Sequence, residues 1–500
     1  MAMKHALFTT VLTPLLLLTG GAARPEIPSY APKAERTAEP DQPIPRQTLD
    51  AMDRRELGPL YTPQVAAKLP DAHLLLERYF AVQQKAERAA ALAQIKALSL
   101  DPVVLGRIAR IRLYWPELQP GVYYVNERVG PYNLIYFFGI PKAYDRAKPW
   151  PLVVKLPGAH PFITDPPPTA DQVQQLYTGW IQDEVRAHPD AVVLMPLLNL
   201  DELWGPSYKG TNSAVQPIFH IAGRVNIDPA QVYVMGHAMA GHATWNLALH
   251  YPTLFAAINP MSGGASLPFQ RLRAVNLRNI LAVTWHDEDD TVVKVDSSRA
   301  IVKMLKDLKY DVDYEETKGV GHAPTDEIAA RLYDKMRKRI RPLYPQQVSL
   351  ASNRPDTLFN RNDWVQVYQM LAPGKEKKAS VLHGSGTITF QENSYTITAA
   401  FTAPNRIEVT CGNVESMRFY LNDQMVDLSK PVTVLVNRRS RFEGLLKPGT
   451  EDMLADQLFL GRGWRYYTGV IDVDFGALPS VLSATRPATR RGTIEYTPPD

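Results

Sequence analysis

One segment of the chain reads VYVMGHAMAGHATW, from Val232 to Trp245. Its first four residues are apolar and typical of a buried strand, Gly236 follows them, and a helical pattern then continues to about Tyr251. This spacing places Ala238 at the apex of a tight turn from strand to helix. A methyl side chain at that apex cannot be deprotonated and cannot form an ester.

Similar strand–helix units surround this segment. Short apolar strands that alternate with helices indicate a mostly parallel sheet with helices on both faces. We therefore predict an α/β domain over residues 121–345, entered through two antiparallel strands between residues 121 and 140. The expected strands are 152–156, 191–195, 232–235, 256–259, 280–285 and 312–316, and the expected helices lie near 171–187, 213–224, 238–250, 296–309 and 325–340.

The flanking regions have different patterns. Residues 356–500 show short alternating strands separated by Gly, Asn and Pro, which predicts an all-β, sandwich-like domain. Residues 66–120 have helical periodicity and predict a helical lead-in. Residues 24–65 are rich in Pro and Ala without hydrophobic periodicity, and we expect a linker there.

Residues 1–23 are typical of a signal peptide. Lys4 precedes an apolar stretch over residues 7–18, and Gly21-Ala22-Ala23 supplies small residues for cleavage. We expect a secreted or periplasmic protein with no stable membrane insertion after cleavage. An uncleaved amino-terminal anchor is the alternative.

Composition excludes several classes of function. The 55 basic and 51 acidic side chains leave a net charge of +4, too small and dispersed to predict a nucleic-acid partner. Cys411 is the only cysteine, so no intramolecular disulfide forms. An acidic cluster alone is a weak sign of a cation site, and we expect no metal and no cofactor. The pattern carries no indication of oligomeric state.

The segment 122–341 resembles the α/β-hydrolase superfamily, in particular secreted bacterial esterases and the prolyl-oligopeptidase-like and dienelactone-hydrolase-like serine hydrolases. The resemblance is carried by Gly236-His237-x-Met239 and Thr244-Trp245, which match the nucleophile elbow of these enzymes. The family has a serine where this chain has Ala238. The elbow departs from the family again at Ala240 and Ala243, and the oxyanion turn departs at Pro157. These further departures favour natural divergence over an engineered serine-to-alanine change.

The resemblance also implies the remaining catalytic groups. Asp290 aligns with the triad acid, with Asp289 as the alternative, and His322 aligns with the base. The backbone N–H groups of Ala159 and Met239 would form the oxyanion hole, with His160 as the alternative to Ala159.

Pocket candidates follow from the same comparison. They are His160, Trp204, Tyr208 and His237. The expected ligand is a small-molecule ester, a peptide or a glycan.

Three hypotheses about function result. The first is an exported serine-hydrolase-like protein that is catalytically inactive but retains a ligand pocket. The second is an active hydrolase that uses activated water or another nucleophile, such as Ser262 or His237. The third is a carbohydrate-binding, cell-wall-binding or scaffold protein that acts through aromatic residues of the carboxy-terminal region, namely Tyr395, Tyr420, Trp464, Tyr466 and Tyr467.

Overall fold

The computed structural model describes residues 42–129, 132–158, 170–197, 208–265, 267–354, 360–380 and 387–475. The expected signal peptide and residues 24–41 of the expected linker lie outside these ranges.

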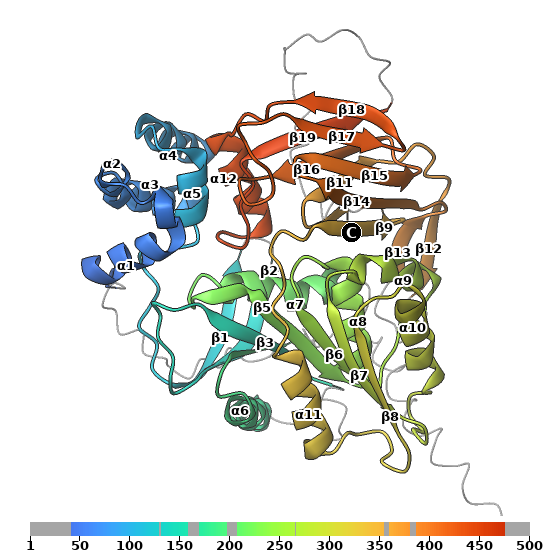
Figure 1. Cartoon of the computed structure of the whole chain (residues 1–500). Helices are drawn as coiled ribbons and strands as arrows, with labels where there is room; N and C mark the ends of the chain where they lie inside the picture. Colours follow the sequence, from blue (N-terminus) through green and yellow to red (C-terminus); the bar gives the residue numbers. More distant parts are fainter. Residues whose placement is uncertain are drawn as a thin grey trace, which may run out of the picture.

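The centre of the molecule is an eight-stranded sheet in the order β1-β2-β4-β3-β5-β6-β7-β8 (Figure 1). The first two strands form an antiparallel hairpin, β2 pairs antiparallel with β4, and the other pairings are parallel. This order is that of an α/β-hydrolase fold, so the predicted fold class is confirmed. The strands are β1 Gly121–Val129, β2 Tyr132–Ile140, β3 Trp150–Leu156, β4 Val192–Pro196, β5 Ile227–His237, β6 Ala257–Met261, β7 Leu281–Asp287 and β8 Val312–Thr317.

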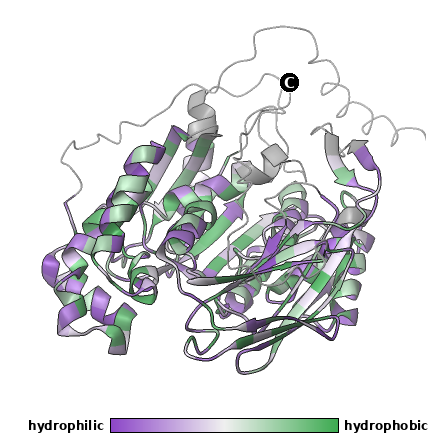
Figure 2. Cartoon of the chain, turned by 90° about the horizontal axis from the view of Figure 1, so that it is seen from above, coloured by the Kyte–Doolittle hydropathy of each residue, from purple (hydrophilic) through white to green (hydrophobic). Residues whose placement is uncertain are grey.

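Helices cover both faces of this sheet. Val232 and Val234 pack with residues of α7, α8 and α10, whereas Tyr233 and Met235 pack with α11 on the opposite face. Successive residues of β5 therefore alternate between two buried layers. In Figure 2 hydrophobic colour follows the strands, while the helices alternate between hydrophobic and hydrophilic along their turns. The helices are α6 Ala170–Ala187, α7 Tyr208–Ile221, α8 Met239–His250, α9 Pro268–Leu272, the 3-10 helix η4 Arg273–Leu277, α10 Asp296–Asp307 and α11 Asp326–Met336.

The amino-terminal region is helical and begins earlier than predicted. The expectation of a linker up to residue 65 is wrong from Arg46 onward, because Leu49 and Met52 of the first helix are buried against Ile111 and Trp115. The sequence pattern did not indicate this helix, because only one narrow face of it is apolar and the region around it is rich in Arg and Pro. The elements are α1 Arg46–Leu57, η2 Gly58–Leu60, α2 Pro63–Ala66, α3 Leu69–Ala81, α4 Lys85–Ala97 and α5 Pro102–Ile108.

A helix that spans a membrane must be both long and apolar. Among the described residues no single helix is long and apolar enough, and α4 with α5 passes only as a pair bent by 120°.

The carboxy-terminal region contains two main sheets that share one apolar core, in the orders β18-β17-β15-β14-β9 and β10-β11-β16-β19. Pairing is antiparallel except between β15 and β17. The region begins at Gln347, and it includes helix α12, which the all-β prediction missed. Its elements are β9 Gln347–Ser352, β10 Arg361–Asn362, β11 Val365–Gln369, β12 Glu376–Ser380, β13 Thr387–Gln391, β14 Tyr395–Ala403, β15 Arg406–Gly412, β16 Ser416–Leu421, β17 Val432–Val436, β18 Arg439–Gly444, α12 Thr450–Leu460 and β19 Gly469–Asp474.

Candidate active site

Ala238 lies between β5 and α8 in a backbone conformation that is unusual for alanine. Its φ is 58° and its ψ is −119°, at the position that precedes the first residue of α8. Its N–H donates to the Met261 carbonyl (3.0 Å), and its own carbonyl accepts from the His242 N–H (3.1 Å). Positive φ at a non-glycine residue is strained and persists only where the surroundings impose it. The chain thus holds an alanine in a strained, sharp turn from strand to helix.

Glycines on either side allow this turn to pack closely. A Cβ on Gly236 would lie 2.4 Å from the Ala240 carbonyl oxygen, and one on Gly241 would lie 2.3 Å from the Met261 oxygen. Ala240 itself is completely buried in the α8 layer. The departure at Ala240 is therefore accommodated, because the close backbone approaches fall on Gly236 and Gly241.

Asp290 and His322 meet directly. His322 Nδ1 lies 2.8 Å from Asp290 Oδ2, and the Asp290 side chain is fully buried while that of His322 is 25% exposed. The other carboxylate oxygen accepts the N–H groups of Val292 (2.8 Å) and Val293 (3.0 Å). Burial alone would raise the pKa of Asp290, but these hydrogen bonds and the one from His322 lower it below its ordinary value. The neighbouring Asp289 is exposed, so the carboxylate that contacts His322 is Asp290.

This contact also defines the tautomer of His322. An ionised carboxylate only accepts hydrogen bonds, so Nδ1 carries a proton, and in the neutral ring Nε2 carries the lone pair. Within the described ranges no hydrogen bond reaches Nε2.

A second histidine, His286, also forms a hydrogen bond with the Asp290 carboxylate. The sequence reasoning missed this residue. His286 Nε2 lies 3.1 Å from Asp290 Oδ2 and 2.9 Å from the Val293 carbonyl oxygen, and its Nδ1 lies 2.7 Å from Ser298 Oγ. Both partners of Nε2 are acceptors, so that nitrogen donates. Its position four residues before the acid is the signal in the sequence that could have revealed it.

The loop that carries His322 is fastened to two neighbouring strand ends. The His322 carbonyl accepts from His237 Nε2 (2.7 Å) and from Ser262 Oγ (2.8 Å), and the two imidazole rings are 4.7 Å apart. Burial lowers the pKa of His237. Ser262 is completely buried and donates its proton to this carbonyl. Its geometry is that of a structural hydroxyl, which argues against Ser262 as a replacement nucleophile.

Asp287 fastens the same loop from β7. Its Oδ2 accepts from Thr317 Oγ1 (2.8 Å) and from the Val320 N–H (3.0 Å). Burial would raise its pKa, but these hydrogen bonds lower it below the ordinary value. Asp287 therefore positions the segment immediately before His322.

The oxyanion and pocket predictions are covered only in part by the described residues. Met239 is the first residue of α8, so its N–H lacks an intrahelical acceptor and lies at the positive end of the helix dipole. Ala159, His160 and Trp204 lie outside the described residues, as does the side chain of Tyr208, the first residue of α7. Those assignments stay predictions. Across the described part of the chain, no group of three or more His, Cys, Asp or Glu side chains could hold a metal ion.

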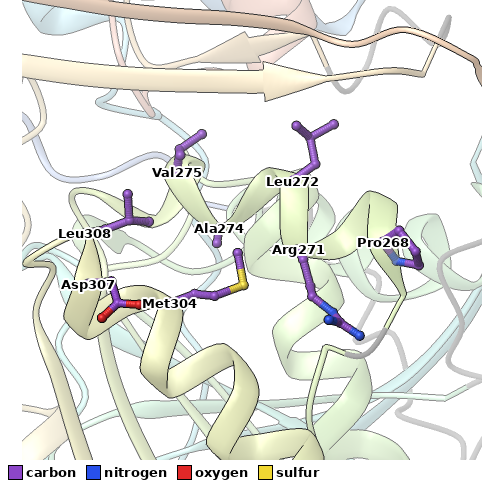
Figure 3. Close-up of a pocket in the computed structure, with 8 residues that line it drawn as sticks. All are labelled: Pro268, Arg271, Leu272, Ala274, Val275, Met304, Asp307 and Leu308. Carbon is purple, nitrogen blue, oxygen red and sulfur yellow. The ribbon is translucent and has the colours of Figure 1, made fainter.

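A surface pocket of about 420 Å³ lies between α9, η4 and α10 (Figure 3). None of its lining residues belongs to the predicted site, so this pocket is separate from the Asp290–His322 pair. It is lined by Pro268, Arg271, Leu272, Ala274, Val275, Met304, Asp307 and Leu308.

The aromatic residues considered for carbohydrate binding are interior residues. All five are at most 6% exposed, so they form no exposed aromatic row and give the carbohydrate-binding hypothesis no support. They pack inside the carboxy-terminal region and against the neighbouring helices: Tyr395, Tyr420, Trp464, Tyr466 and Tyr467.

No family model matches the sequence, and no curated protein matches it. Several solved structures are similar to part of the chain. A thermostable esterase shares 24% identity, with 44% of this chain and 63% of that chain covered and a TM-score of 0.37. A putative dipeptidyl aminopeptidase IV from Bacteroides ovatus shares 16%, with 44% and 35% covered and a TM-score of 0.35. A putative dienelactone hydrolase from Klebsiella pneumoniae shares 15%, with 43% and 95% covered and a TM-score of 0.34. The matched regions thus span less than two thirds of the first two proteins.

Proposed function

We propose that this protein is a secreted or periplasmic relative of serine hydrolases that binds a ligand without hydrolysing it. The observation that carries the proposal is Ala238, which occupies the strained elbow position directly after β5 and before α8. The ligand class that suits such a site is a small-molecule ester, a peptide or a glycan.

The neighbouring groups explain what has been kept and what has been lost. Asp290 orients His322, whose Nε2 is free to accept a proton, and the Met239 N–H is placed to stabilise developing negative charge. The methyl group of Ala238 cannot attack an acyl carbon. Removing the nucleophile of a triad costs about 10⁶ in turnover, so only a residual rate is expected.

Restoring the serine tests this proposal. Hydrolysis of short p-nitrophenyl esters is measured for wild type, Ala238→Ser and the double variant Ala238→Ser/His322→Ala. Wild type is expected to be silent, and Ala238→Ser is expected to raise kcat/KM by about 10³-fold or more. The double variant should return to the wild-type level, because the hydroxyl then has no base.

A further double variant, Ala238→Ser/Asp290→Asn, tests the acid. It should lower kcat of the restored enzyme by about 10³–10⁴-fold, because the wrong imidazole tautomer is then held.

The intact Asp290–His322 pair favours one second candidate, hydrolysis by a water molecule that His322 activates. Wild-type turnover that disappears with His322→Ala would establish this candidate and refute the inactive one. Silence of wild type and of Ala238→Ser alike, with both proteins folded, would refute the retained site.

A further inference from the structure

Three arginines line a small recess that the proposed function does not use. The recess has a volume of about 20 Å³, which is room for roughly one water-sized particle. Three distant parts of the chain form it: residues 110–115 after α5, residues 222–229 from the end of α7 into β5, and residues 462–464 after α12. The arginines are Arg110, Arg112 and Arg462, and Trp115 and Trp464 add aromatic walls.

Two of the three positive charges are balanced. Arg462 is buried, pairs with Glu77 at 2.7 Å, and donates to the carbonyls of Ala109 and Ile111. Arg110 pairs more loosely with Glu56, at 3.5 Å.

Arg112 has no such counterpart. Within the described ranges, no hydrogen bond or ion pair reaches its guanidinium, although the side chain is partly buried. Burial and the charge of Arg462 lower the pKa of Arg112 to about 9 against the opposing effect of Glu77, so the group stays protonated at neutral pH. A partly buried charge without a negatively charged partner is less stable than the same charge in water, and a counterion offsets that cost.

We propose that this recess binds one small monovalent anion of chloride size as the counterion of Arg112. The residual charge of the recess is a single positive charge, which calls for a single negative one. The volume is that of one small particle, which suits a monatomic anion better than sulfate or phosphate. Guanidinium supplies several N–H donors in one plane for such an ion. Because its walls come from three regions of the chain, the bound anion stabilises their association, independently of any activity at Ala238.

Thermal unfolding of the full chain tests this proposal. Melting is compared in sodium chloride and in sodium gluconate at equal ionic strength. Chloride is expected to raise Tm by about 1–2 °C for each tenfold increase above its dissociation constant, whereas gluconate is too large to enter.

Three variants isolate the recess. Arg112→Gln should abolish the difference between chloride and gluconate. Glu77→Gln should enlarge it, because Arg462 then adds a second unbalanced charge. Arg406→Gln, which removes an exposed arginine paired with Glu408, should leave it at the wild-type size.

Bromide supplies a readout that needs no variant. Crystals grown with bromide should show an anomalous peak beside the Arg112 guanidinium. The absence of that peak from an otherwise ordered recess would overturn the proposal, as would a chloride effect of wild-type size in folded Arg112→Gln.

Discussion

At the scale of single residues, Ala238 shows that a strained backbone turn can exist without a reactive side chain. The positive φ of Ala238 persists although no serine is there to use it. The turn is maintained by backbone contacts, namely the hydrogen bonds to Met261 and His242 and the close approaches at Gly236 and Gly241. The turn therefore does not depend on a hydroxyl at position 238, because the side chain there does not hold it.

The strain at this position should be measurable. Ala238→Gly is expected to raise the free energy of unfolding by about 1 kcal/mol, because glycine adopts positive φ without a Cβ clash. The matched control is Ala240→Gly inside α8, which should lower it by about 1 kcal/mol. Urea unfolding at pH 7 measures both. A destabilised Ala238→Gly would show that alanine is unstrained in this turn.

At the scale of elements, a charge cluster fastens helix α6 to strand β3. Glu184 lies 2.7 Å from Lys155 Nζ through one oxygen and 3.1 Å from His188 Nε2 through the other. Burial would raise the pKa of Glu184, but Lys155 and His188 more than offset that effect and lower it to about 2. Lys155 is in β3, the strand that leads into the predicted oxyanion turn. The cluster therefore fixes this strand against α6.

The cluster predicts a specific loss of stability in acid. The folded-state pKa of Glu184 is lower than the unfolded one, so its contribution is complete above about pH 4.5 and disappears as the pH falls toward 2. The contribution amounts to at most about 3 kcal/mol. Urea unfolding at pH 7 and pH 3 should show a smaller acid loss for Glu184→Gln than for wild type.

An exposed carboxylate provides the control for this measurement. Glu288 lies 3.5 Å from Lys318 at the surface, and Glu288→Gln should alter stability little at either pH because water screens the pair. Identical acid losses in wild type and Glu184→Gln would contradict the assignment.

At the scale of the whole molecule, a buried ion cluster joins the α/β domain to the carboxy-terminal sheets. Asp363 lies 2.6 Å from Arg341, which follows α11, and 3.3 Å from Arg465, which precedes β19. All three side chains are almost completely buried. Asn276 of η4 adds a reciprocal pair of hydrogen bonds with the backbone of Ala351 in β9. The two regions are therefore expected to unfold as one unit.

Removing the shared carboxylate tests this coupling. Asp363→Asn should lower the free energy of unfolding by about 3–5 kcal/mol, because two buried guanidinium charges are then left without a negatively charged partner. Asp472→Asn, in the exposed pair with Arg418, should cost less than about 1 kcal/mol. Urea unfolding followed by tryptophan fluorescence and by far-ultraviolet circular dichroism should give coincident transitions for wild type. Two separate transitions would contradict a single cooperative unit.

The parts of this protein that depend on local pattern can be predicted from the amino-acid sequence alone. Short apolar strands with helices between them predict the parallel sheet, since both faces of such strands are buried. The expected strands and helices of the α/β domain are all found close to their predicted ranges. The order of the strands also brings Asp290 close to His322, because the loops after the neighbouring strands β7 and β8 meet at one edge of the sheet.

Features that depend on contacts between distant residues could not be predicted from local pattern and follow from the tertiary structure. Helix α12 is stabilised where Met453 and Leu454 pack on the amino-terminal helices, and α1 is stabilised by Ile111 and Trp115. The burial of Tyr467 likewise follows from packing. A short segment cannot reveal such contacts, because its burial depends on surfaces that other parts of the chain supply.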